Sequence, residues 1–204
     1  MEQGTPLRNS PVQRRAGLTV DRILEAANTL ILKRGHAYAT TKRIAKMAHC
    51  SIGTVYHYFP KKESISASLL ENLVIISTGP VRRHLLASMH APLAECLPEQ
   101  IRLVLVSRRI ILEFRRQLHR GAVRTDGELS LLKPEDILYT TNRAFFSHHR
   151  SEIKVDDLEA ALYTTAYLVI GVTDAHIAAD ASAVTDEQVV THLSDVVLRY
   201  LTQS

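Results

Sequence analysis

The sequence predicts an all-α protein, and three observations support this fold class. No segment shows the apolar–polar alternation that is typical of a half-buried strand. Apolar residues instead recur every three or four positions along most of the chain, and prolines and glycines separate these segments. Near the N-terminus, two segments of about two turns each are joined by a tight turn, which is typical of a helix-turn-helix.

The chain opens with a segment that lacks apolar periodicity. Residues 1–17 combine Gly and Pro with Arg8, Arg14 and Arg15, and we expect a flexible basic arm. Thr19 is then the expected cap of the first helix, which Gly35 ends. One face of this helix carries an apolar stripe that predicts core packing: Ile23, Ala27, Leu30 and Ile31.

The stretch Thr40–Glu63 carries the helix-turn-helix pattern. A short helix with Ile44 and Ala45 on its apolar face precedes a turn at residues 49–50. Ser51 is a natural N-cap for the second helix. Pro60 cannot continue a helix interior, so that helix must end near Tyr58. Neither helix is long enough to be stable alone, and both must pack against a third.

This stretch resembles the signature of the tetracycline-repressor (TetR) family of bacterial transcription regulators. The residues that carry the resemblance are Gly35, Thr40, Ile44-Ala45, Gly53-Thr54-Val55-Tyr56-His57-Tyr58-Phe59 and Lys62-Glu63. The resemblance covers about residues 18–78. In two places the sequence departs from the family pattern. His49 replaces the usual turn Gly, in a region of backbone space that His tolerates better than most residues, and Arg43 replaces an acidic residue, which excludes a capping box there.

The resemblance implies double-stranded DNA as a partner. Thr40, Thr41, Lys42, Tyr56 and Lys62 resemble the family's phosphate contacts, although Lys42 could equally belong to a solvated helix face and Tyr56 to the core. On the second helix, the expected contacts with the DNA bases come from exposed residues near its start: Ser51, Ile52, Gly53, Thr54, His57 and Tyr58. The basic arm could contact DNA phosphate or the minor groove, or be merely disordered.

Six further helices are expected after Pro60. We place the first five at about Lys62–Thr78, 81–91, Glu99–Arg120, Pro134–His149 and Asp157–Ala179, with a loop at 121–132. Gly79-Pro80 ends the first of these, and Pro98 precedes the third. Thr185 and Gln188 predict a capping box that opens the last helix, Asp186–Leu201. The expected domains are the arm at 1–17, the helix-turn-helix domain at 18–64, and a helical effector-binding and dimerisation domain at 65–204.

The last two helices are the expected subunit interface of a homodimer. Two amphipathic helices per chain can form a four-helix bundle across a two-fold axis, and small residues such as Gly171 allow close approach. The alternative is that both apolar stripes pack only within one chain. The residues expected at the interface are Leu158, Ala161, Leu162, Thr165, Val169, Val189, Leu193, Val196, Val197 and Tyr200.

The resemblance also implies a pocket for a small-molecule effector inside the second domain. Mapped by position, its expected residues are Val104, Arg108, Ile111, Phe114, Tyr139, Asn142, Phe146, Tyr163 and Tyr167. Apolar walls with a few hydrogen-bonding groups are typical of a ligand pocket, but a core with satisfied hydroxyls has the same composition. We expect an apolar ligand that is neutral or anionic, with Arg108 as its counter-charge.

Charge and motif content support a nucleic-acid-binding protein over an enzyme. Residues 1–64 hold eleven Lys or Arg against four Asp or Glu, and the remaining residues hold 14 against 17, so a basic N-terminal third precedes a slightly acidic remainder. The sequence contains no GxSxG, HExxH, phosphate-loop or Rossmann pattern. The spacing of the ten His and two Cys residues predicts no metal site, and we expect no cofactor. Without an apolar signal segment or an 18-residue apolar run, the expected location is the cytoplasm rather than a membrane.

Together these features predict a homodimeric repressor that binds palindromic operators and is released by a small molecule. One alternative is a TetR-like DNA-binding protein without an effector, which binds a protein partner or the nucleoid. A helical enzyme is a further alternative and would require a convergent acid–base pair. A cavity in the second domain would favour the effector-responsive repressor.

Overall fold

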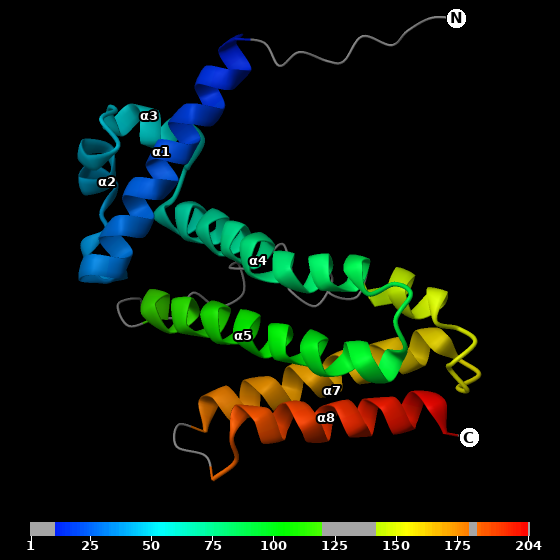
Figure 1. Ribbon diagram of the computed structural model, residues 1–204. Helices are drawn as coiled ribbons and strands as arrows, with labels where there is room; N and C mark the ends of the chain where they lie inside the picture. Colours follow the sequence, from blue (N-terminus) through cyan, green and yellow to red (C-terminus); the bar gives the residue numbers. More distant parts are fainter. Residues whose placement is uncertain (1–10, 120–141, 180–182, 204) are drawn as a thin grey trace, which may run out of the picture. The chain divides into compact units, whose positions relative to one another are not determined.

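The computed structural model describes residues 11–119, 142–179 and 183–203, apart from the side chains of residues 11–15 and 119. Every regular element in these ranges is helical, which confirms the predicted all-α class. The elements, shown in Figure 1, are α1 (Pro11–Arg34), η1 (His36–Tyr38), α2 (Thr41–Met47), α3 (Ile52–Tyr58), α4 (Lys62–Ala87), α5 (Leu93–His119), a helical stretch at 142–148, α7 (Leu158–Ala178) and α8 (Asp186–Thr202).

The described residues form two compact units. The first, here called the head, contains the residues up to Leu69 and the end of α5 from Arg116. The second, here called the body, contains residues 70–115 and the described residues from 142 onward. Helix α4 begins in the head and ends in the body, so the chain passes between the units within one continuous helix.

Helix α1 is longer than the sequence predicted. It begins at Pro11, so the expected arm is helical from residue 11 to 17, and Thr19 is not a cap. Proline is well suited to the first position of a helix, and one exposed Gly inside a helix costs only about 1 kcal/mol, so Gly17 does not stop it. Residues 1–10 lie outside the described residues.

Helices α4 and α5 both continue through prolines that were expected to bound them. Helix α4 passes Gly79 and Pro80, which makes the separate helix predicted at 81–91 wrong. Its buried stripe of Val74, Val81 and Leu85 is continuous across the proline, and this packing outweighs the lost hydrogen bond. Among the described helices, α4 alone is long and apolar enough to cross a membrane. However, 44% of its most apolar 18-residue segment is buried inside the protein.

The start of α5 also differs from the prediction. The helix begins at Leu93 rather than at Glu99, and Pro98 lies inside it. The backbone N–H of Leu93 donates to the Glu152 carboxylate at 3.1 Å, which satisfies a helix-start donor from 59 positions away in the sequence. Residues 142–148 are helical as predicted; the earlier part of that predicted helix and the expected loop at 121–132 lie outside the described residues.

The body is built around one large apolar cluster. Helices α4, α5, α7 and α8 and the stretch 142–148 all contribute to it, with members that include Val81, Leu97, Phe146, Ile170 and Val197. Helices α7 and α8 pack against each other in opposite directions (Figure 1). The predicted capping box at the start of α8 is confirmed, with reciprocal bonds between Thr185 and Gln188.

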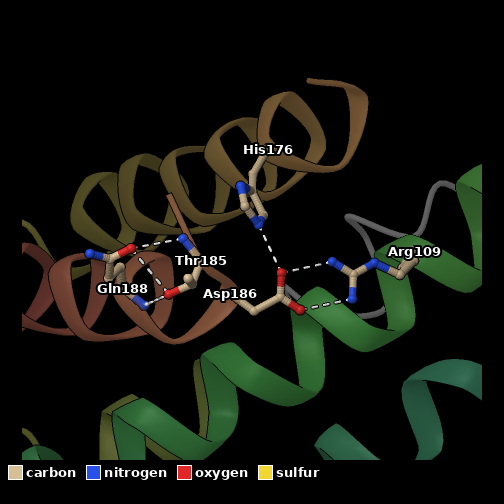
Figure 2. Close-up of polar contacts among 5 residues, drawn as sticks. All are labelled: Arg109, His176, Thr185, Asp186 and Gln188. Atoms are coloured by element: carbon tan, nitrogen blue, oxygen red, sulfur yellow. Dashed lines mark hydrogen bonds and ion pairs between the residues drawn. The ribbon is translucent and has the colours of Figure 1, made fainter. Parts of the chain in front are cut away.

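A polar cluster joins three helices of the body where α8 begins. Figure 2 shows Asp186 of α8 between Arg109 of α5 and His176 of α7. The Arg109 guanidinium donates two bonds of 2.8 Å to the Asp186 carboxylate, and the His176 Nε2 lies 2.8 Å from the same group. The hydrogen bond from Arg109 is the main cause of an Asp186 pKa far below its ordinary value.

Candidate nucleic-acid interface and ligand pocket

The turn of the head places α3 as the sequence predicts. His49 has a φ of 52°, the left-handed conformation expected at this position. The Ser51 Oγ accepts a bond of 2.9 Å from the backbone N–H of Thr54, which confirms the predicted N-cap, and α3 ends at Tyr58, before Pro60. Val55 of α3 and Ile44 of α2 are buried, so the opposite side of α3 faces solvent.

The solvent-facing side of α3 carries most of the residues expected to contact DNA. Ser51, Ile52, Gly53, Tyr56 and His57 are exposed, and Thr54 and Tyr58 are half-buried. The Tyr56 ring is 50% exposed, so it does not belong to the core, and its hydroxyl lies 3.3 Å from the Thr41 Oγ of α2. Helices α2 and α3 thus bring two hydroxyls together on one outer surface, where they can donate to a single anion.

The other residues expected to contact phosphate differ in their exposure to solvent and in their hydrogen bonds within the chain. Thr40 and Lys42 are exposed, and Thr40 also caps α2 by accepting from the backbone N–H of Arg43. The Lys62 ammonium donates to the carbonyl oxygen of His36, and partial burial lowers the Lys62 pKa. Lys62 therefore holds the start of α4 against η1. A second contact supports the same junction, because the His36 ring lies 3.0 Å from the buried Ser66 Oγ.

The body contains a pocket between α5, the stretch 142–148, α7 and α8. It holds about 430 Å³ of atom-free space, counting its open mouth, and is narrow. Its lining is mainly apolar and contains no charged side chain among the described residues: Leu97, Gln100, Ile101, Val104, Asn142, Phe146, Thr165, Ala166, Val169, Ile170 and Val197. Gln100 and Asn142 are joined by a bond of 2.7 Å from the Gln100 Nε2 to the Asn142 Oδ1.

Comparison with known proteins identifies the head. Residues 23–69 match the family model described as bacterial regulatory proteins of the tetR family. The head therefore resembles the DNA-binding domain of the TetR family. A relative with the same helix-turn-helix domain, an uncharacterised HTH-type transcriptional regulator of Mycobacterium tuberculosis, is 44% identical over 52 residues. That match covers 26% of this chain and 26% of the relative, about a quarter of its length, so it concerns the TetR head alone.

Solved structures extend the similarity in fold to about nine-tenths of the chain. A proposed TetR-family transcriptional regulator from Mesorhizobium loti has a TM-score of 0.59 at 16% identity, over 91% of this chain and 96% of that one. The regulator RolR, in its complex with resorcinol, has a TM-score of 0.52 at 16% identity, over 92% and 89% of the two chains. At these identities the likeness shows a shared fold: a TetR-type head followed by a larger helical body.

The structure separates the residues that the sequence suggested for the effector pocket. Val104, Asn142 and Phe146 line it. Ile111 and Phe114 are buried in the helix packing without lining the pocket. Tyr163 and Tyr167 are 59% and 46% exposed, with ring centroids 4.6 Å apart, and do not line it. Tyr139 lies outside the described residues.

Arg108 has a partner of its own chain. It is 2% exposed, and its Nε and Nη2 donate to the Asp174 carboxylate, with the Nε bond at 2.7 Å. This pair neutralises the guanidinium, and Arg108 does not line the pocket. The pair thus gives no support to the expectation that Arg108 serves as the counter-charge of an anionic ligand.

The helices expected to form the subunit interface each have a buried and an exposed face. Six of the ten expected residues are buried in the chain's own core: Ala161, Leu162, Thr165, Val189, Leu193 and Val197. Leu158 and Val169 are half-buried, while Val196 and Tyr200 are 49% and 44% exposed. The exposed faces of α7 and α8 are therefore made largely of other residues, among them Tyr163, Tyr167 and Gly171.

Sequence reasoning missed several pocket residues. Leu97, Gln100, Ile101, Ala166 and Ile170 line the pocket but were not named as candidates. Gln100 could have been found, because it is a polar residue within the apolar stripe of α5, between Leu97 and Val104. The apolar residues carry no such signal, because their periodicity predicts burial without showing where the packing leaves a space.

Proposed function

We propose that this chain is a cytoplasmic, homodimeric transcriptional repressor that binds a palindromic operator and is released by a small molecule. The observation that carries the proposal is the TetR-type head, whose α3 presents an exposed, hydroxyl-rich face next to α2. The pocket in the body supports the effector role and favours this function over an effector-free DNA-binding protein.

In this proposal α3 lies in the major groove and α2 lies against the backbone. Thr40, Thr41, Lys42 and Tyr56 contact phosphate, while Ile52, Gly53, Thr54, His57 and Tyr58 read bases, with Ile52 against a thymine methyl. Lys62 adds positive charge near the phosphates and also fixes α4 through the His36 carbonyl. The phosphate contacts position the protein and make affinity depend on salt, whereas the base contacts select the sequence.

A dimer supplies two heads for the two half-sites of a palindrome. We propose that the exposed faces of α7 and α8 form its interface, with Tyr163, Tyr167 and Gly171 on α7 and Val196 and Tyr200 on α8. Tyrosine is enriched at protein interfaces, and glycine allows close approach of helices. The buried residues of both helices stabilise the body itself.

Release by a ligand requires the pocket to be coupled to the head. Pocket residues Leu97, Phe146 and Ile170 belong to the same apolar cluster as Val81 and Leu85 of α4. Helix α4 is continuous from Lys62 in the head, which donates to the His36 carbonyl, to Ala87 in the body. A ligand that prefers one packing of this cluster would move α4 and thereby shift the population of DNA-binding conformations. In RolR, resorcinol is a bound ligand, which supports small-molecule binding in this fold.

The test is DNA selection from a genomic fragment library, followed by affinity measurements across salt concentrations. Affinity should fall by about 0.9 log units per phosphate contact for each log unit of salt. Tyr56→Phe removes one exposed hydroxyl and should weaken binding roughly tenfold on all sequences, since a hydrogen bond to a charged group contributes about 1.5–3 kcal/mol. Tyr38→Phe, the same change at another exposed position of the head, is the control. Unchanged affinity for Tyr56→Phe and Lys62→Ala would overturn the proposed DNA-binding surface.

A further inference from the structure

Among the residues that the structure describes, one buried hydrogen-bonding group of the pocket has no partner. Gln100 is 5% exposed. Its Nε2 donates to the Asn142 Oδ1, while its Oε1 is buried and makes no hydrogen bond. Both residues line the pocket. Buried polar side-chain atoms in folded proteins nearly always have a partner. An amide oxygen at the wall of a cavity that no described residue bonds therefore points to a partner from outside them, such as a ligand.

The other polar groups of the pocket differ from Gln100. The Thr165 hydroxyl donates to the Ala161 carbonyl at 2.9 Å, so its proton is already used within α7. The other lining residues, apart from Asn142, are apolar. Hydrogen-bond specificity in this pocket therefore rests on the Gln100–Asn142 amide pair.

The charges of the described residues around the pocket oppose binding of an ionic ligand. None of the described lining residues is charged. Arg108 is a buried cation one turn after the lining residue Val104 on α5, and it forms an ion pair with Asp174. A carboxylate or an ammonium entering this pocket would lose its hydration and gain no opposite charge from the described lining, a combination that strongly opposes binding.

We infer that the ligand of this pocket is a neutral, largely apolar molecule whose hydroxyl group bonds to the Gln100 side chain. A hydroxyl can donate to the amide oxygen and can also accept from an amide nitrogen, so it satisfies the pair in either orientation of the two amides. The apolar remainder of the molecule would lie against Leu97, Phe146 and Ile170. This inference rests on the proposed function, and it specifies the effector class.

The inference predicts a ranking among three naphthalenes that differ in one group, and it predicts binding of an aliphatic alcohol. Sites that bond a ligand hydroxyl discriminate strongly against an analogue that lacks it, because the protein group is then left unpaired. The probes are 2-naphthol, its methyl analogue 2-methylnaphthalene and the anion 2-naphthoate, with 1-octanol as an aliphatic alcohol. Calorimetric titration of the full chain should show an alcohol binding at least about tenfold more tightly than 2-methylnaphthalene, and 2-naphthoate binding most weakly.

Substitutions locate the hydroxyl contact. Gln100→Leu, or Gln100→Met if the first variant folds poorly, should reduce the preference for 2-naphthol over 2-methylnaphthalene to less than about twofold. Gln203→Leu makes the same change at an exposed position outside the pocket and should retain the preference. Ala166→Phe should fill the pocket and abolish binding of every probe. Circular dichroism checks that each variant is folded.

Three results would overturn the inference. One is equal binding of 2-naphthol and 2-methylnaphthalene, another is tightest binding of 2-naphthoate, and the third is no binding of either alcohol. Parallel DNA titrations distinguish this inference from the proposed function. If a Gln100-dependent alcohol leaves DNA affinity unchanged, the ligand class stands and the effector role fails. If the probes lower DNA affinity without a hydroxyl preference, the regulator stands and the ligand class is wrong.

Discussion

Two adjacent valines of α8 provide a sharp test of how this helix is used. Val197 is 2% exposed and belongs to the apolar cluster of the body, whereas Val196 is 49% exposed. Val197→Arg and Val196→Arg are therefore the same chemical change at a buried and at an exposed position of one helix. We expect the first to destabilise the fold and the second to separate the subunits.

The expected magnitudes follow from the two environments. Val197→Arg loses the burial of a valine side chain, about 1.5–3 kcal/mol, and places a charge in the core at a further cost of several kcal/mol. This total is comparable with the whole stability of a typical domain, about 5–15 kcal/mol. Val196→Arg should change the stability of the isolated chain by only about 0.5 kcal/mol. In a symmetric dimer it would place two like charges close together, which costs several kcal/mol of association free energy.

The assay combines sedimentation velocity over a range of concentrations with thermal unfolding followed by circular dichroism. Wild type should sediment as a dimer at micromolar concentration. Val196→Arg should be a folded monomer, and Val197→Arg should lose most of its helical signal at 37 °C. A Val196→Arg variant that remains a dimer would refute the proposed interface. A Val197→Arg variant that is folded and fully stable would refute the burial argument itself.

Three further outcomes follow from the described contacts. Gly171 is exposed within α7, and a Cβ added there would have no atom within 4 Å, so Gly171→Ala should stabilise the monomeric chain by about 0.5–1 kcal/mol. If sedimentation equilibrium shows a weaker dimer for the same variant, a second copy of the chain lies against α7. Ser51→Ala removes the cap of α3 and should lower the stability of the head by about 1 kcal/mol. Hydrogen exchange of the α3 amides measures this loss, and Ser147→Ala, at an exposed position of the body, is the control. The Asp186 pKa is lowered from its ordinary 3.8, so the stabilising contribution of Asp186 is present above about pH 4 and is lost as the pH falls further. Asp186→Asn should reduce the free energy of unfolding at pH 7 by at most about 1 kcal/mol, because the Arg109–Asp186 pair is half-exposed. A difference from wild type that persists undiminished at pH 2 would contradict this linkage.

The sequence alone determined the features that depend on neighbouring residues. Ser51 sets the start of α3 by capping it, and Pro60 sets its end because proline has no backbone N–H. Both effects act within one turn of the helix. The same is true of the capping box of Thr185 and Gln188. The left-handed turn at His49 and the helical class follow from local preferences and from periodicity.

Contacts between distant segments decided the rest. Helix α5 begins at Leu93 because Glu152 supplies a carboxylate to its first N–H, and α4 continues past Pro80 because Val81 and Leu85 are buried against other helices. Periodicity showed that α7 and α8 each have an apolar face, but only the packed structure shows that Leu193 and Val197 belong to the chain's own core while Val196 and Tyr200 face outward. The pocket and the unpaired Gln100 oxygen arise where several helices fail to fill the space between them, and that space is a property of tertiary packing, which no local sequence pattern encodes.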